Sequence, residues 1–242
     1  MPSTSFFGRH DNVYLYVPNL IGYARLAFAF YGFAVASTHP GYMMACYALS
    51  FVCDELDGRF ARMLGQTSTL GQVLDMVTDR VATSCLLATL CVLYPRWQVL
   101  FLALLSLDIF SHWFQMFSTG ARGNTTHKDV ESRSVVVRFY YRNRIFMGFC
   151  CVCCEVLYLA LYALAWPRYR ALAVGRLPAA AVRLLHPWVA PHVAKALARP
   201  ISLPVAIAAA AAPGAIIKQF VNVIQLRNAA DTLVKLDLEK RA

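Results

Sequence analysis

Four aspartates are arranged in two pairs on neighbouring helical segments. Asp54 and Asp57 are three residues apart and Asp75 and Asp79 are four apart, so each pair shares one helix face. A short turn containing Gly65 connects the segments, which makes the two helices antiparallel and allows their acidic faces to meet. Clustered carboxylates repel one another unless cations neutralise them, and Mg²⁺ and Mn²⁺ prefer such oxygen ligands. The spacing therefore predicts a divalent-metal site, with two ions to balance the four charges.

The residues between the two pairs suit a ligand that carries phosphate. Gly58 removes a side chain where a ligand could approach the backbone, and Gly71 could do the same on the facing helix. Arg62 could pair with a phosphate oxygen, because a guanidinium matches phosphate geometry. Ser68 lies in the turn and could donate its hydroxyl. Together these residues predict a phosphate-bearing substrate.

Other classes of membrane protein also use buried carboxylates. A divalent-cation transporter or channel could use all four aspartates, but it does not explain the fixed spacing of Gly58, Arg62 and Gly71. A purely structural membrane protein has no need for four acids, since charges near a bilayer are costly. An enzyme would release a product only when divalent metal is present, whereas a transporter would carry the metal into liposomes. Measuring both separates these interpretations.

The composition predicts an integral membrane protein with an all-α fold. The chain has 242 residues, of which 59% are hydrophobic and 15% are charged, and its mean hydropathy is +0.50. A soluble domain has roughly 25% charged residues and could not bury this much apolar surface. A spanning helix needs about 20 apolar residues. We expect six transmembrane helices, at about 18–37, 41–64, 70–93, 98–117, 145–166 and 203–226.

The segments outside these spans complete one membrane domain, residues 1–242. Residues 1–17 predict an interfacial lead-in, whose short helix carries Tyr14 and Tyr16 at headgroup level. Residues 227–242 predict a polar, amphipathic tail helix at the membrane surface. The connection 167–202 is rich in Ala, Pro and Arg and could lie on the membrane, but no role for it follows from the sequence.

The net charge of +10 fits a surface of anionic lipid rather than nucleic acid, because the arginines flank apolar stretches and form no dense run. More Lys and Arg lie on the side of the two termini than on the other, which favours cytosolic termini.

The eight cysteines fall inside apolar stretches. Cys150–Cys154 has the CxxC spacing, but no second cluster completes a metal shell, so we interpret these cysteines as core residues.

The complete pattern around the aspartates is D-x-x-D-G-x-x-A-R-x8-G-x-x-x-D-x-x-x-D. It resembles the signature of the CDP-alcohol phosphotransferase family and departs from it at no position: Asp54, Asp57, Gly58, Ala61, Arg62, Gly71, Asp75 and Asp79. Within that family the chain is similar to eukaryotic phosphatidylinositol synthases over about residues 12–166. The likeness includes the segments 12–26, 74–81, 111–113, 127–128 and 138–141.

The resemblance implies that CDP-diacylglycerol and myo-inositol give phosphatidylinositol and CMP, with Mg²⁺ or Mn²⁺ as cofactor. It implies that the four aspartates hold the metal and that Asp79 is also the base for the inositol hydroxyl. Gly58, Arg62 and Ser68 then contact CDP-diacylglycerol. It further implies a homodimer in the endoplasmic reticulum with its active site facing the cytosol. Serine, glycerol phosphate or a phospholipid remain alternative acceptors within the family.

An inositol pocket needs several polar donors and acceptors in a confined site. The candidates are His112, His127, Lys128, Arg138, Tyr141 and Glu155. Each also has an ordinary interpretation, as an interfacial anchor or as part of a solvated loop. In the first span, Pro18, Asn19 and Arg25 could close the nucleotide side. Alternatively Arg25 and Arg80 are cations that reach back to the interface, which is common for arginines near span ends.

Overall fold

The computed structural model describes residues 7–8, 10–121, 142–176 and 199–240. The chain divides into two compact units, Met1–Thr89 and Leu90–Ala242, and the division falls in the last turn of a long helix. Each unit is described by itself. In the described residues the structure is helical apart from one short pair of strands, which agrees with the predicted all-α class.

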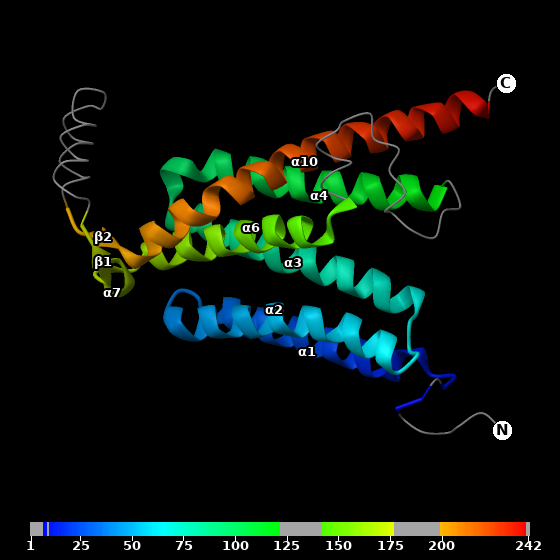
Figure 1. Cartoon of the computed structure of the whole chain (residues 1–242), viewed down its shortest axis with the longest axis horizontal. Coiled ribbons are helices and arrows are strands. Elements are labelled where there is room, and N and C mark those ends of the chain that lie inside the picture. The colour runs from blue at the N-terminus through cyan, green and yellow to red at the C-terminus, as the bar shows by residue number, and fades with distance from the viewer. Residues whose placement is uncertain (1–6, 9, 122–141, 177–198, 241–242) are drawn as a thin grey trace. The chain divides into compact units, whose positions relative to one another are not determined.

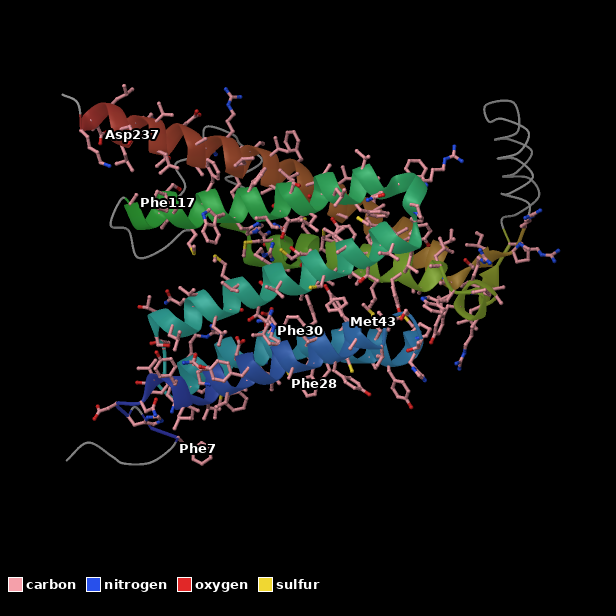
Figure 2. The ribbon with its side chains drawn as sticks, turned by 180° about the vertical axis from the view of Figure 1, so that it is seen from behind. Phe7, Phe28, Phe30, Met43, Phe117 and Asp237 are labelled. Carbon is pink, nitrogen blue, oxygen red and sulfur yellow. The ribbon has the colours of Figure 1, made fainter. Side chains whose placement is uncertain are left out.

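The first unit contains the 3₁₀ turn η1 (Val13–Leu15) and the helices α1 (Val17–Ala34), α2 (Pro40–Met63) and α3 (Thr69–Leu93). Proline stands in the first turn of α1 and of α2, where its missing N–H costs no hydrogen bond. α1 and α2 lie side by side (Figure 1). Their packing is close at Gly32, where a Cβ would lie 3.1 Å from Cys46 Cβ. Met43, labelled in Figure 2, is buried in the same region.

The turn between α2 and α3 is built by side chains. Gly65 has φ +64°, a backbone conformation that favours glycine. Ser68 precedes α3, and its Oγ accepts a hydrogen bond from Gly71 N at 3.0 Å, which caps the helix. Gln66 is fully buried: its Oε1 accepts from Val17 N at 2.8 Å and its Nε2 donates to Gly8 O at 2.9 Å. The turn is thereby attached to the beginning of α1.

The second unit contains η2 (Pro95–Trp97), α4 (Gln98–Ala121), α6 (Arg144–Leu164), α7 (Pro167–Arg170) and α10 (Leu203–Glu239). α10 packs along α6 and α4 (Figure 1). Two short strands, β1 (Ala173–Gly175) and β2 (Ile201–Ser202), pair antiparallel before α10 begins. α10 and α6 approach closely at Gly214, where a Cβ would lie 2.6 Å from Cys153 Sγ. Such small residues let membrane helices pack tightly.

All six helices expected from the sequence are present among the described residues. Five of them lie within a few residues of their predicted bounds, whereas α10 continues past the predicted end at residue 226 to Glu239. Four helices in the described part of the chain are long and apolar enough to cross a membrane: Thr69–Leu93, Pro95–Ala121, Ile145–Leu164 and Leu203–Glu239. α1 and α2 do not meet that criterion, since α1 includes Asn19 and Arg25 and the second half of α2 is strongly charged. The chain is an integral membrane protein with four candidate spans.

Two further expectations concern the ends of the chain. Among the described residues of the lead-in before α1, the helical element is the short turn η1, in which Tyr14 is exposed. The tail is helical as expected, but through Glu239 it continues α10 and does not form a separate helix. Large apolar side chains are exposed on the helices of the second unit, such as Val99 on α4 and Ile216 on α10. Phe117 of α4, labelled in Figure 2, is also exposed. Exposed apolar surface of this extent suits a lipid environment.

Candidate metal centre

The four motif aspartates converge on one guanidinium in the first unit. Arg25 of α1 contacts Asp54 Oδ1 through Nη2 at 2.7 Å and Asp57 Oδ2 through Nη1 at 3.5 Å. Its Nη1 also donates to Asp75 Oδ1 at 3.0 Å, and its Nη2 donates to Asp79 Oδ1. The first pair comes from α2 and the second from α3. The sequence prediction that the two acidic faces meet is therefore confirmed.

The donor set fits a divalent metal. One oxygen each from Asp54, Asp57 and Asp75 lies within 4.8 Å of the other two, close enough to share one ion. All three ligands are hard carboxylate oxygens, the kind that Mg²⁺ and Mn²⁺ prefer. Asp57 is the most buried of the four aspartates, and Asp75 is half exposed. A single guanidinium cannot neutralise four carboxylates, so the cluster retains an affinity for further cations.

The packing of α1 against α2 and α3 fixes this geometry. Ser50 of α2 is buried and donates through Oγ to the backbone oxygen of Arg25 at 3.2 Å. Gly22 lies one turn before Arg25, and a Cβ there would come within 2.8 Å of Leu74 Cδ2 on α3. The absence of a side chain at Gly22 thus allows α1 to approach α3 next to Asp75. The close contact brings the guanidinium to both aspartate pairs.

Gly71 stands at a second close approach. A Cβ on this residue would lie 2.8 Å from Asn19 Oδ1 and 3.1 Å from Ser68 Oγ. Asn19 is almost fully buried, and its Nδ2 donates to Val13 O at 2.6 Å. The glycine therefore accommodates the side chains of α1 and of the turn, which is a different role from the approach of a ligand that the sequence suggested.

Gly58 and Arg62 lie together on α2. A Cβ on Gly58 would meet the guanidinium of Arg62 at 3.5 Å, an ordinary contact distance. Gly58 directly follows Asp57, and the Arg62 side chain from the next turn covers the helix surface that the glycine leaves bare. This arrangement places a guanidinium beside the motif carboxylates on the same helix.

Two of the six candidates for an inositol pocket fall in the described residues. His112 of α4 contacts Asp108 O through Nδ1 at 2.8 Å and Ser111 Oγ at 3.1 Å. Glu155 of α6 follows Cys154 directly in the chain. Both residues belong to the second unit. His127, Lys128, Arg138 and Tyr141 lie outside the described residues.

A buried hydrogen-bond network joins α10 to α6 in the second unit. Lys218 Nζ donates to Asn222 Oδ1 at 2.7 Å, and Asn222 Nδ2 donates to Gln219 Oε1 at 3.3 Å. Gln219 Nε2 then reaches Tyr158 OH at 3.1 Å and Cys154 Sγ at 3.2 Å. Lys218, Asn222, Tyr158 and Cys154 are all buried. We call this group the Lys218 network.

Sequence reasoning missed several of these residues. For Arg25 the sequence leaves two interpretations open, and the one in which it reaches back to the interface is wrong, because its side chain is 3% exposed and contacts the four aspartates. Lys218 and Asp108 are lone charges within apolar segments, a signal that marks functional or structural polar sites in membranes. All eight cysteines are free; Cys91, Cys150, Cys153 and Cys154 are buried, and the other four are partly buried.

Comparisons with known proteins place this cluster in a family. The sequence profile described as CDP-alcohol phosphatidyltransferase matches residues 15–217, which include every motif position. This chain belongs to the CDP-alcohol phosphatidyltransferase family. The family assignment inferred from the eight motif residues is therefore confirmed. A comparison with solved structures finds no significant match.

Curated relatives of this CDP-alcohol phosphatidyltransferase cover nearly its whole length. It is 44% identical to the probable CDP-diacylglycerol–inositol 3-phosphatidyltransferase 2 of Arabidopsis thaliana, over 95% of this chain and 94% of that protein. It is 38% identical to the CDP-diacylglycerol–inositol 3-phosphatidyltransferase of Schizosaccharomyces pombe, over 96% and 94%. It is 35% identical to the protein of that name in Homo sapiens, over 96% and 97%. The likeness therefore extends beyond residue 166, the limit expected from the sequence.

Proposed function

We propose that this chain transfers the phosphatidyl group of CDP-diacylglycerol to myo-inositol, giving phosphatidylinositol and CMP. The observation that carries the proposal is the convergence of the two motif aspartate pairs from α2 and α3 in one cluster. The choice of inositol is supported by relatives that are named for this reaction and match the chain along nearly its full length.

The proposed ligands of Mg²⁺ or Mn²⁺ are Asp54, Asp57, Asp75 and Asp79. Two divalent ions would balance the charges of these four carboxylates. A divalent ion held by these residues would neutralise negative charge on the diphosphate and on the departing CMP. The protein supplies the rigid placement of the carboxylates, because α1 holds α2 and α3 together through Ser50 and Gly22.

Asp79 is the proposed general base. It would accept the proton of an inositol hydroxyl while that oxygen attacks the phosphorus that carries diacylglycerol. The new bond joins the inositol oxygen to this phosphorus, and the bond from the phosphorus to the CMP oxygen breaks. CMP leaves with the electron pair of that bond. Asp79 contacts Arg25, and Arg80 Nη2 lies 3.6 Å from its second oxygen, so cations surround this carboxylate.

Gly58, Arg62 and Ser68 are the proposed contacts for CDP-diacylglycerol. The guanidinium of Arg62 lies over Gly58 and could form a forked pair with phosphate oxygens. Ser68 Oγ accepts from Gly71 N, which leaves the hydroxyl hydrogen to donate toward a ligand. His112, His127, Lys128, Arg138, Tyr141 and Glu155 remain the proposed contacts of inositol.

The membrane arrangement is part of the proposal. We propose one membrane domain in which α1 and α2 also span the bilayer, giving six spans, with residues 1–17 and the end of α10 near the surface. Charge asymmetry supports cytosolic termini and an active site that faces the cytosol. Residence in the endoplasmic reticulum and a homodimer follow from the family resemblance. A fluorescent fusion in cells and light scattering of the purified protein test these two points.

An acceptor panel tests the function. The purified chain in liposomes that contain CDP-diacylglycerol receives inositol, serine, glycerol 3-phosphate or phosphatidylglycerol, and CMP release is measured with Mg²⁺, Mn²⁺ or EDTA. We expect CMP release with inositol and a divalent ion, and phosphatidylinositol as the lipid product. Release with another acceptor alone would leave the family intact and overturn the substrate. Metal flux into the liposomes without CMP release would support the transporter instead.

A further inference from the structure

Arg25 contacts the same carboxylates that a divalent ion would need. Its two terminal nitrogens reach all four motif aspartates, and its side chain is 3% exposed. The Asp54 and Asp75 oxygens that it contacts, at 2.7 and 3.0 Å, belong to two of the three residues whose oxygens could share one ion. The guanidinium places a positive charge next to these carboxylates and occupies part of their acceptor capacity, and both effects oppose the binding of a second cation.

We propose that Arg25 is an internal counter-ion that competes with divalent metal for the aspartate cluster and so weakens its metal affinity. Arg25 is thus a positioning residue, which acts on the reaction through the carboxylates. The proposal rests on the metal-binding part of the proposed function and is independent of the acceptor.

The contacts of Arg25 make it replaceable by a metal ion. Its Nε is buried and has no hydrogen-bond partner in the described part of the chain, so the guanidinium is incompletely satisfied. An unpaired buried donor costs free energy, which lowers the cost of moving this side chain. Ser50 binds the backbone of Arg25 rather than its side chain, so the guanidinium can shift while α1 stays in place.

The alternative role for Arg25 is purely structural. In that role the guanidinium holds four repelling carboxylates in position, and its removal disperses them and weakens metal binding. Competition predicts the opposite sign, because removal of a positive charge and of its hydrogen bonds frees the oxygens for the ion. The direction of the change in metal affinity therefore separates the two roles.

The test is a titration of the purified full chain in detergent with Mn²⁺ alone, in which the free ion is measured by electron paramagnetic resonance. For Arg25→Gln we expect the Kd for Mn²⁺ to fall by about tenfold or more, since the cation no longer opposes binding. Arg25→Lys keeps the positive charge, but an ammonium group can contact fewer carboxylates at once. Its Kd for Mn²⁺ should therefore lie between that of the parent chain and that of Arg25→Gln. An unchanged or raised Kd in Arg25→Gln overturns the proposal.

Arg59→Gln is the matched control. Arg59 lies on α2, is exposed, and pairs only with Glu55 among its ion-pair contacts in the described residues, through Nε at 2.8 Å. Its removal changes the net charge equally but leaves the cluster untouched, so the Kd should stay within about twofold, as for a screened surface charge. A fall equal to that of Arg25→Gln would assign the effect to net charge and overturn the proposal.

Thermal unfolding provides a second readout. The Tm of Arg25→Gln in EDTA should be lower than that of the parent chain. Mn²⁺ should raise the Tm of the variant by more than it raises the Tm of the parent, because the variant lacks the Arg25 charge that neutralises part of the cluster. If Arg25→Gln gives no folded protein under either condition, Arg25→Lys decides: tighter Mn²⁺ binding than in the parent supports competition, and equal or weaker binding overturns it. Loss of the inositol reaction in the acceptor panel leaves these results unaffected.

Discussion

The two units each bury a basic side chain among polar partners, but the direct partners are charged in one unit and neutral in the other. In the first unit Arg25 faces four carboxylates, so negative charge is in excess. In the second unit Lys218 begins a chain of hydrogen bonds through Asn222 and Gln219 to Tyr158, all of which are neutral groups. The aspartates come from two helices and meet a third, whereas the Lys218 network joins α10 to α6.

This difference indicates which polar group in a membrane protein binds a ligand of opposite charge. The Arg25 cluster cannot neutralise itself, so a further cation stabilises it. The Lys218 network pairs donors with acceptors along its length, which stabilises the contact between two helices. A rule that treats every intramembrane charge as catalytic would assign the same role to the Arg25 cluster and to the Lys218 network. The comparison predicts that changes in the first unit act on turnover, and that changes in the Lys218 network act first on stability.

Asp79→Asn should give the largest effect. The variant keeps the shape of the side chain but removes the base and one charged metal ligand, so we expect kcat to fall by roughly 10²–10⁴-fold. CMP release in liposomes with saturating inositol measures it. Glu55→Gln is the control, since Glu55 lies on α2 next to Asp54, is exposed and pairs with Arg59. Near-normal turnover of Asp79→Asn would remove Asp79 from the role of base.

Lys218→Met should act on stability instead. Methionine fills a similar volume but leaves the buried Asn222 Oδ1 without the Lys218 donor, at a cost of about 1–3 kcal/mol in unfolding free energy. The Tm in detergent should therefore fall, while kcat and the Kd for Mn²⁺ stay near those of the parent. Lys235→Met makes the same replacement at an exposed site on the same helix and should change little. A large loss of kcat at unchanged Tm would instead make Lys218 part of the reaction.

Helix positions were predictable because local signals fix them. Pro18 and Pro40 stand in the first turns of α1 and α2, and the turn before α3 contains Gly65 and Ser68. The end of α10 was not predictable from polarity. Residues 227–239 are polar on average, but they contain no glycine or proline and many good helix formers, so the helix continues.

The aspartate pairs were predictable from spacing, and Arg25 was not. An i, i+3 or i, i+4 spacing fixes which carboxylates share a face, since it depends on one helix alone. The position of Arg25 depends on how α1 packs on two other helices, through contacts such as Gly22 with Leu74. The sequence holds no local sign of that contact. Lys218, by contrast, is the only charged residue in the segment 203–226, so its burial was open to prediction.

Ser68 offers the smallest expected effect and separates two roles within the first unit. Ser68→Ala removes the cap on Gly71 N and should cost about 1 kcal/mol in unfolding free energy. Ser68→Asn keeps an oxygen that can cap the helix but loses the hydroxyl, so its Tm should stay near that of the parent. If Ser68 also donates to CDP-diacylglycerol, both variants should raise the KM for that lipid by a similar factor. A raised KM in Ser68→Ala alone would mean that the serine acts on the substrate only through the helix that it caps.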